Sequence, residues 1–549
     1  MPSLPRIPVL LAALGFTTAV AFTAGCSKGQ TAVTSSAQAA APKAKILRLG
    51  NGAEPQDLDP QAVSGLIEHH IIMALFEGLV AEDPKDLHPV PGLAENWEIS
   101  PDGLTYIFHL RPSLKWSNGA PLTADDFVQS YRRMLSPALA SEYSYLLWFV
   151  RGAEEFNKGA LTEFSQVGFK APDDRTLVIT LKSPTPFLLK VIASHYAWMP
   201  VPVKEITRYG ALDERRSPWT RPEHMVSSGP FRLREWSPNQ KIVVERNPFY
   251  WDAATVKLDG IEFYPIDDIS AEERMFRTGQ IHKTQDVPLA KIDTYRRDFP
   301  GSLRLEPYLG VGYYLFNVTR PPFTDKRVRR ALTLAIDRES LVKNVLRGGQ
   351  QPAYVLSYPG TAGYFPRARL DGGVPEARRL LAEAGYPEGK GFPDTELVYN
   401  SSENNRILAE AMQQMWRQNL GIDIHLINQE WKVYRDMQRT HNFTLGRAGW
   451  IADYVDPHVF LEIWVTGNGN NDGLYSSPAY DRLFHQALTA RSEAERYEFY
   501  QQMDAILMDE CPMLPIYHYA RVYALSPKVK GWYPTLLDNH PYKFVDLAE

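Results

Sequence analysis

The stretch FTLGRAGWIADYVDP (residues 443–457) opens as a short apolar strand, passes through two glycines and ends in an acid-rich turn. Glycine inside a strand weakens it, so Gly446 and Gly449 predict that another backbone approaches this segment closely. An arginine, a tryptophan and an aspartate follow one another within a few residues of these glycines. We therefore expect residues 443–457 to form one wall of a binding cleft.

The bulk composition fits a large folded chain with no nucleic-acid partner. With 549 residues, 44% of them apolar, the chain is long enough for two or more lobes, each with its own core. The net charge of −5 is small for this length, and no long basic run is present. Such a charge balance argues against nucleic acid. Aromatic residues make up 12% and can serve either cores or binding surfaces.

The N-terminus is typical of an exported protein. Arg6 precedes an apolar run over residues 7–25, which predicts a signal peptide spanning residues 1–25. Residues 23–26 (TAGC) resemble the bacterial lipoprotein cleavage box, with Thr23 in place of the usual leucine. Lipidation of Cys26 would then anchor the protein to a membrane through a flexible tether over residues 26–45. Cleavage by the ordinary signal peptidase, leaving a free periplasmic protein, stays open as the alternative.

The cysteine content excludes an internal disulfide in the mature chain. Cys511 is the sole cysteine after Cys26, so the exported domain must rely on its core. Cys511 lies beside an apolar segment and is expected to be a buried small residue. It carries no indication of catalysis.

The mature chain mixes strand and helix signals, which predicts an α/β fold. A Pro-Asp-Gly turn inside residues 97–110 predicts a β-hairpin. Thr123 and Asp126 form an acidic capping box that starts a helix. Further strands are predicted over residues 46–49, 177–181, 241–245, 261–264 and 422–426, and helices over residues 69–79, 123–135, 325–336 and 408–416.

These motifs resemble a known family. Residues 93–97, 108–111, 115–119 and 123–127 are similar to the signature of family 5 extracellular solute-binding proteins. Residues 428–432 and 447–454 resemble the oligopeptide-binding members of that family and their murein-tripeptide-binding relatives. The likeness extends from about Leu47 to the C-terminus.

The resemblance implies a two-lobed α/β periplasmic binding protein (type II, cluster C), with an extra domain and a discontinuous first lobe. The implied segments are 46–66, 200–306 and 521–549 for the first lobe, 67–199 for the extra domain and 307–520 for the second lobe. It also implies a monomer that carries an extended oligopeptide to the permease and ATPase subunits of an ABC importer.

A receptor for varied peptides must recognise the groups that all peptides share. An acid suits the α-ammonium, and a cation suits the α-carboxylate, through charge-assisted hydrogen bonds. By resemblance, Asp453 holds the peptide N-terminus. The planar guanidinium of Arg447 matches a carboxylate, although a structural salt bridge is nearly as good an interpretation.

The remaining site residues also come from the resemblance. Ala448, Gly449, Trp450 and Ile451 would pair with the peptide backbone, with Glu54 and its loop opposite. Trp431 and Trp450 would bound side-chain pockets, and Tyr145 and Tyr519 are weaker candidates. Asn405 stands where the family carries a histidine near the C-terminus of a longer peptide, which leaves the preferred peptide length open.

No catalytic constellation is visible in the sequence, so no enzyme activity, metal or cofactor is expected. The adjacent His69 and His70 point to different faces of a helix and are poor co-ligands. Other ligands of this family are murein tripeptide, dipeptides, haem, nickel and sugars. Asp453 favours a ligand with a free amine over nickel or sugar. A chaperone-like role and a peptidase-like enzyme are the further alternatives.

Overall fold

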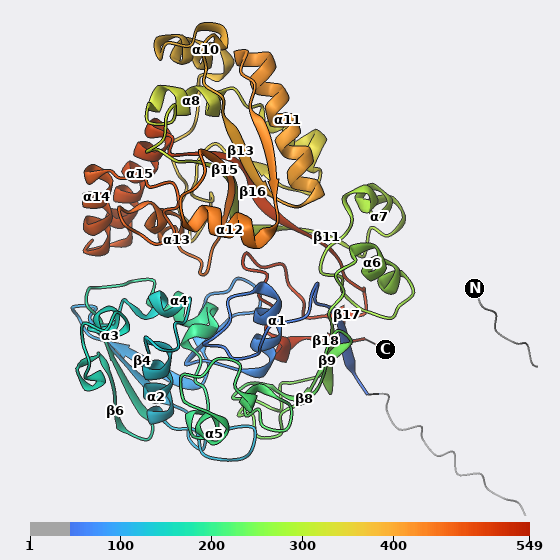
Figure 1. Ribbon diagram of the computed structural model, residues 1–549. Coiled ribbons are helices and arrows are strands. Elements are labelled where there is room, and N and C mark those ends of the chain that lie inside the picture. The colour runs from blue at the N-terminus through green and yellow to red at the C-terminus, as the bar shows by residue number, and fades with distance from the viewer. Residues whose placement is uncertain (1–43, 549) are drawn as a thin grey trace, which may run out of the picture. The chain divides into compact units, whose positions relative to one another are not determined.

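The computed structural model describes residues 44–548, apart from the side chains of Glu403, Trp431 and Lys432. The predicted signal peptide, Cys26 and the tether up to Lys43 lie outside the described residues. No helix within residues 44–548 combines the length and apolar character that a membrane span needs. The described chain contains three larger β-sheets surrounded by helices (Figure 1).

The first sheet holds the start of the described chain. Its order is β1–β10–β9–β8, with β1 parallel to β10 and the other pairs antiparallel. Leu47 lies opposite Ile261, and both are fully buried. The strands are β1 (Ile46–Gly50), β8 (Phe231–Ser237), β9 (Lys241–Arg246) and β10 (Gly260–Tyr264). The strands predicted over residues 46–49, 241–245 and 261–264 are therefore confirmed.

The second sheet is antiparallel, in the order β4–β5–β7–β6. The predicted hairpin is β4–β5, and Gly103 adopts the positive φ of 69° in its turn. The predicted capping box of helix α2 (Ala124–Met134) is present in both directions. The strands are β4 (Ala94–Ile99), β5 (Thr105–Leu110), β6 (Phe169–Asp173) and β7 (Thr176–Thr180). Helices α3 (Ala153–Asn157), α4 (Leu188–Ser194) and α5 (Val203–Tyr209) lie near this part, whereas α1 (Leu66–Leu75) packs against β8 of the first sheet.

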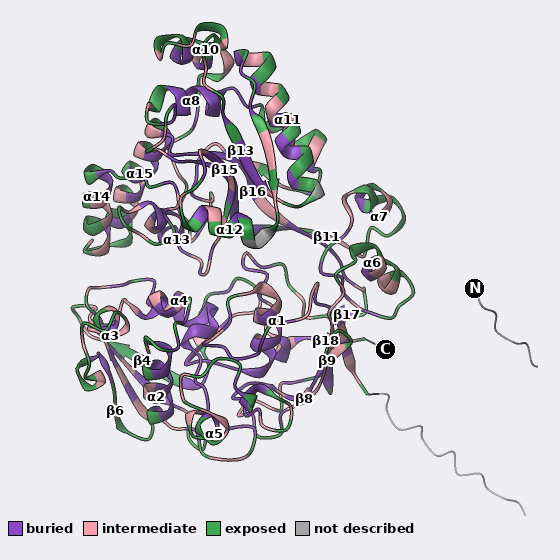
Figure 2. Cartoon of the chain, viewed as in Figure 1, coloured by how far each residue is buried: buried purple, intermediate pink, exposed green. Residues whose placement is uncertain are grey.

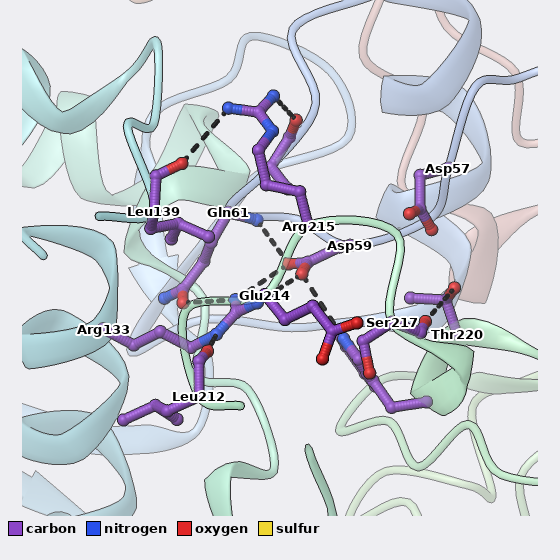
Figure 3. A network of polar contacts seen from close by, with 12 residues as sticks. Asp57, Asp59, Gln61, Arg133, Leu139, Leu212, Glu214, Arg215, Ser217 and Thr220 are labelled. Atoms are coloured by element: carbon purple, nitrogen blue, oxygen red, sulfur yellow. Dashed lines mark hydrogen bonds and ion pairs between the residues drawn. The ribbon is translucent and has the colours of Figure 1, made fainter. Parts of the chain in front are cut away.

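A buried ion pair joins the loop after β1 to α2 (Figure 3). Both Arg133 terminal nitrogens donate to the Asp59 carboxylate, at 3.0 and 2.6 Å. The amide N–H of Gln61 and the indole N–H of Trp219 also donate to Asp59. Arg133 donates further to Gln61 Oε1 and to the carbonyl of Leu212. Every charge in this network therefore meets an opposite charge and additional hydrogen bonds, as buried ions require.

The third sheet has six strands in the order β12–β16–β11–β15–β13–β14. Its strands are β11 (Leu303–Phe316), β12 (Gln351–Pro352), β13 (Glu396–Asn400), β14 (His425–Gln429), β15 (Leu445–Ile451) and β16 (Met513–Ala524). The long strands β11 and β16 pair from Leu303–Ala524 to Leu315–Met513. Isolated bridges at Lys283 then link β1 to the residue that follows β16. These two strands therefore connect the six-stranded sheet to the first sheet.

Helices cover the six-stranded sheet, and the central strands form its most buried part (Figure 2). Predicted helices are present as α8, which Asp325 caps, and as α11. The helices are α8 (Lys326–Leu334), α9 (Arg338–Ser340), α10 (Gly373–Glu383), α11 (Glu403–Leu420), α12 (Trp431–Arg439), α13 (His458–Leu461), α14 (Pro478–Leu488) and α15 (Glu493–Glu510). Two further helices, α6 (Ile269–Arg277) and α7 (Ile292–Asp298), lie beside β11 and β16, the two strands that connect the six-stranded sheet to the first sheet. Smaller two-stranded pairs are β2 (Val80–Glu82) with β3 (Pro89–Pro91) and β17 (Val529–Lys530) with β18 (Asp546–Leu547).

Two predicted boundaries were wrong for local reasons. The helix predicted over residues 69–79 is α1, which ends at Leu75 because Phe76 adopts extended backbone. The strand predicted over residues 422–426 is β14, which begins only at His425. Gly421 ends α11 in the left-handed conformation, and the buried Ile422 and Ile424 belong to the connection that follows.

Candidate functional site

Strand β15 has one edge that is paired only at its beginning. On one side it pairs with β11 from Leu445 to Ile451, and on the other side with β13 only at Leu445 and Gly446. The amide of Ala452 donates to the carbonyl of Leu309 on β11. In an antiparallel pair, every second residue directs its N–H and C=O toward the partner strand, so Ala448 and Trp450 also bond toward β11. Residues 447, 449 and 451 therefore direct their backbone groups away from β11.

The free part of this edge belongs to Gly449 and Ile451. The carbonyl of Arg447 accepts a hydrogen bond from the side chain of Gln438, at 3.2 Å. For Gly449 and Ile451, the described chain supplies no partner strand on that side. An unpaired strand edge is a template for an extended chain, which can add to it through main-chain hydrogen bonds.

Contacts within the chain also restrict the two glycines of β15. A Cβ on Gly449 would lie 2.7 Å from the hydroxyl of Tyr519, and one on Gly446 would lie 3.3 Å from the ring of Phe443. Within the described chain the closest neighbours of both positions are aromatic side chains, and the approach of a ligand backbone to this edge stays a prediction. Gly449 makes room for the tyrosine that bonds to Arg447.

Asp453 follows the free edge and has no cationic partner among the described residues. The hydroxyl of Tyr145 donates to Asp453 Oδ2 at 2.9 Å, and Ser194 donates to its main-chain carbonyl at 2.9 Å. Burial raises the pKa of Asp453 to about 6, while the hydrogen bond from Tyr145 acts in the opposite direction. A buried carboxylate without a counter-ion is costly, and a bound ammonium group would remove that cost.

A cavity of about 260 Å³ lies beside Asp453. Asp453 is the only acid among its lining residues, and burial lowers the pKa of the lining His69 and His195, which keeps both imidazoles neutral at pH 7. The other lining residues are Ser64, Gly65, Leu66, Tyr143, Ser194, Tyr196, Tyr308, Ile451, Ala452, Leu537 and Asn539. The cavity therefore offers one negative charge in surroundings that are otherwise neutral and largely aromatic.

A second acid near Asp453, Glu462, is held mostly in its neutral form at pH 7. Burial, with Asp453 as a further cause, raises the pKa of Glu462 to about 8. The hydroxyl of Tyr454 donates to Glu462 at 3.2 Å. The imidazole of His458 lies 3.6 Å from Glu462, but burial lowers its pKa to about 3, so it supplies no charge.

Arg447 lies near the other end of the free edge. Its Nη2 donates to the hydroxyl of Tyr519 at 2.9 Å, and Tyr314, Tyr434 and Tyr517 also surround it. No carboxylate in the described part of the chain lies within ion-pair distance of the guanidinium. The alternative interpretation of Arg447 as half of a structural salt bridge therefore finds no partner. Arginine stays charged, so this side chain is available to an anionic ligand.

The predicted residues do not all gather at this cleft. Tyr145, Tyr519, Arg447 and Asp453 meet in the two contacts given above. Ala448 and Trp450 alternate with Arg447 and Gly449 along β15 and pair with β11. The indole nitrogen of Trp450 is buried without a hydrogen-bond partner in the described structure.

Three other predicted residues have different surroundings. Glu54 accepts hydrogen bonds from Trp236 Nε1 at 2.7 Å and from the amide of Asn239, and it does not line the cavity. Asn405 is buried and donates to Asn400, at the end of β13 beyond its pairing with β15. The backbone of Trp431 begins α12, but its side chain is outside the described part.

Sequence reasoning missed the wall of the cavity that comes from Tyr143 and from the end of α4 and the residues after it. Tyr143, Ser194, His195 and Tyr196 lie far from the β15 motif in the chain, and only the fold brings them to Asp453. Their signal in the sequence was weak: a polar and aromatic cluster directly after the apolar helix α4.

One group of side chains could hold a metal ion in the described residues. Asp83, Asp86 and His88 bring their ligand atoms within 4.8 Å of one another between β2 and β3. This group is largely exposed, and none of its members lines the cavity of Asp453.

Comparison with known proteins decides the family. Residues 88–472 match the family described as "Bacterial extracellular solute-binding proteins, family 5 Middle". The chain belongs to this family. It is 35% identical over 495 residues to the periplasmic oligopeptide-binding protein OppA of Escherichia coli, covering 88% of each chain.

Two solved structures are also similar. The murein tripeptide binding protein MppA of Escherichia coli superimposes with a TM-score of 0.81 and 33% identity, over 92% of this chain and 99% of that one. OppA of Haemophilus influenzae in complex with RPPGFSPFR gives a TM-score of 0.79 and 31% identity, over 92% and 99%. The solute-binding protein therefore has the two-lobed α/β fold of this family, as predicted.

Proposed function

We propose that this protein is the substrate-binding component of a peptide ABC importer, which captures extended oligopeptides in a cleft and delivers them to the membrane permease. The observation that carries the proposal is the unpaired edge of β15, with Asp453 and Arg447 at its two ends. Relatives named for oligopeptide and murein tripeptide binding support it.

Each end of the cleft suits one end of a peptide. Asp453 would bind the α-ammonium, since its carboxylate is buried and meets only neutral donors. Arg447 would bind a carboxylate through its planar guanidinium. Between them, Gly449 and Ile451 would exchange main-chain hydrogen bonds with the peptide, which gives affinity without reading its sequence.

The separation of the two charges limits the length of the ligand. Asp453 lies six residues after Arg447, and a fully extended chain of that length would span about 20 Å at roughly 3.3 Å per residue. We propose that both side chains reach inward along this span, so that a peptide of about three to five residues contacts both. We propose that Asn405, whose amide nitrogen donates to Asn400, contacts a longer peptide through its remaining side-chain oxygen.

Capture would proceed by closure of two lobes. We assign residues 46–66, 200–306 and 521–549 to the first lobe, 67–199 to the extra domain and 307–520 to the second lobe. The crossing strands β11 and β16 would act as the hinge. The contacts of Tyr145 and Ser194 with Asp453 would then be formed on closure, so the closed form alone offers the complete site for the ammonium group.

The remaining parts of the proposal concern the setting of the receptor. The signal peptide predicted over residues 1–25, with Cys26 as its predicted lipidation site, would give a periplasmic protein that a lipid anchors to a membrane of the bacterial envelope. It would act as a monomer with permease and ATPase subunits and would bind peptide without cleaving it. We propose no cofactor.

A murein tripeptide is the second candidate ligand, because the MppA structure superimposes well. It also presents a free amine and carboxylates. Native mass spectrometry of protein purified from its own periplasm distinguishes the candidates. Peptides of varied mass support nutritional uptake, whereas one recurrent mass of a cell-wall tripeptide supports the murein role.

Calorimetric titration with tri-alanine tests the proposed function itself. We expect saturable binding, a large loss of affinity for N-acetylated tri-alanine and a similar loss in the Asp453→Ala variant. The mixture should contain no cleavage products after incubation. Equal affinity of Asp453→Ala and the unaltered protein for tri-alanine would remove the assignment of Asp453.

A further inference from the structure

A second cavity, of about 400 Å³, lies beside the six-stranded sheet, and none of its lining residues lines the cavity of Asp453. Residues from β12 and the loop after it form most of the wall, and His518 of β16 completes it. Its size falls within the range of pockets that hold small organic molecules.

Aromatic rings and prolines give this cavity apolar walls. Tyr354, Tyr358, Pro359 and Pro366 line it, and the ring centroids of Tyr358 and His518 are 4.8 Å apart. Rings at this spacing offer faces and edges on which another planar group can pack. The walls therefore favour a planar, partly apolar ligand.

One arginine of the cavity lacks an acidic partner in the described chain. The Arg369 guanidinium lies 3.8 Å from the centroid of the Tyr354 ring and makes no hydrogen bond or ion pair with another described residue. Arg367, two residues earlier, instead donates to both carboxylate oxygens of Glu498 at 2.8 Å. The two arginines thus line one cavity, but only Arg367 has an acidic partner among the described residues, which leaves the charge of Arg369 for an anion.

His518 adds a buried polar atom without a partner. The residue is only 4% exposed, and its Nδ1 makes no hydrogen bond to the described chain. Burial lowers the pKa of His518 to about 4, so the imidazole is neutral at pH 7 and offers a hydrogen bond rather than a charge. Buried polar atoms are nearly always paired in proteins, so an unpaired one at a cavity wall suggests a ligand contact.

We propose that this cavity is a second binding site, which takes a small aromatic carboxylate. The carboxylate pairs with Arg369, the aromatic ring packs against Tyr354 and Tyr358, and a polar substituent on the ring reaches His518. The proposal stands independently of peptide binding, because its residues are separate from the cleft of Asp453.

Ligand-observed NMR and calorimetry with 4-hydroxyphenylacetate test this site in the purified protein. We expect saturable binding that persists when tri-alanine saturates the cleft. The alcohol 2-(4-hydroxyphenyl)ethanol lacks the carboxylate. It should bind at least about tenfold more weakly than 4-hydroxyphenylacetate, because the charge-assisted contact with Arg369 is lost. Cyclohexylacetate, which keeps the carboxylate but lacks the ring, should also bind more weakly.

Matched variants locate the probe. Arg369→Gln should weaken binding of 4-hydroxyphenylacetate by about tenfold, whereas Arg367→Gln at the paired arginine should change it much less. Both side chains are exposed at the surface, so both variants should keep the melting temperature. Absence of binding to the unaltered protein, equal binding of the alcohol, equal effects of the two variants, or displacement by tri-alanine would each overturn the proposal.

Discussion

Buried charges are paired with each other in the network of Asp59 but not in the cleft of Asp453. Asp59 and Arg133 are almost fully buried, and each satisfies the other through two hydrogen bonds (Figure 3). Asp453 and Arg447 each bond instead to a tyrosine hydroxyl and meet no opposite charge in the described structure. The first arrangement stabilises a fold, whereas the second leaves electrostatic capacity for a ligand.

The largest effect is expected at the paired network. Arg133→Met leaves Asp59 buried without a counter-charge, which should lower the free energy of unfolding by about 3–5 kcal/mol. Denaturant unfolding measures this loss, and calorimetry of the folded variant should give an unchanged affinity for tri-alanine. A stable Arg133→Met variant that no longer binds peptide would contradict the assignment of fold stability to the Asp59 network and of peptide binding to the cleft of Asp453.

Arg447 should affect binding and not stability. Arg447→Gln removes the cation proposed for the peptide carboxylate and should weaken tri-alanine binding by about 10- to 100-fold. The melting temperature should hold, because no ion pair within the described chain is lost. Tri-alanine amide is the matched ligand: if the variant weakens the amide as much as the free acid, Arg447 does not recognise the carboxylate.

The pKa of Asp453 predicts a pH dependence of peptide binding. Because the carboxylate form binds the ammonium form of the peptide, affinity should be highest near pH 7, between the pKa of Asp453 at about 6 and that of an α-amino group at roughly 8, and should fall at lower pH. Between pH 7.5 and 5 the loss should be about tenfold, since a carboxyl loses about tenfold of its charged form per pH unit below its pKa. Titrations across this range test it, with Asp453→Asn as the variant that should lose this dependence. A flat profile for the unaltered protein would argue against an ammonium contact at Asp453.

The smallest effect is expected from the glycine of the free edge. Gly449→Ala places a methyl group 2.7 Å from the hydroxyl of Tyr519, which must shift away from Arg447. Tyrosine side chains can move, so we expect a loss of about 1 kcal/mol in peptide affinity. Gly469→Ala is the matched control, because a Cβ there meets nothing within 4 Å and the backbone needs no positive φ. If both variants bind tri-alanine with the same affinity, peptide binding does not depend on the position of Tyr519.

Local patterns were sufficient for much of the fold. The Pro-Asp-Gly hairpin, the capping box at Thr123 and the strand over residues 241–245 depend on neighbours in the chain, and the structure contains all three. Cys511 is buried as predicted, and burial raises its pKa to about 11. Boundaries near Phe76 and Gly421 were harder, because backbone conformation and not hydrophobic pattern ends those helices.

The site was predictable only in part, because its halves are distant in the sequence. The β15 motif and Asp453 carry a recognisable pattern, but the facing Ser194 and His195 gain their role from tertiary contacts. The contact between Glu54 and Trp236 is likewise invisible in a linear pattern, since 182 positions separate the two residues. The contact between Gly449 and Tyr519 was also unpredictable from the sequence, because Tyr519 lies on another strand.

A thermodynamic cycle tests the central claim, that Asp453 binds the amine of a peptide. Calorimetry gives the affinities of the unaltered protein and of Asp453→Asn for tri-alanine and for N-acetylated tri-alanine. We predict that acetylation costs the unaltered protein about 2–4 kcal/mol, or roughly 30- to 1,000-fold, and costs the variant almost nothing. An equal penalty in both proteins would contradict the account, because the amine would then be recognised elsewhere.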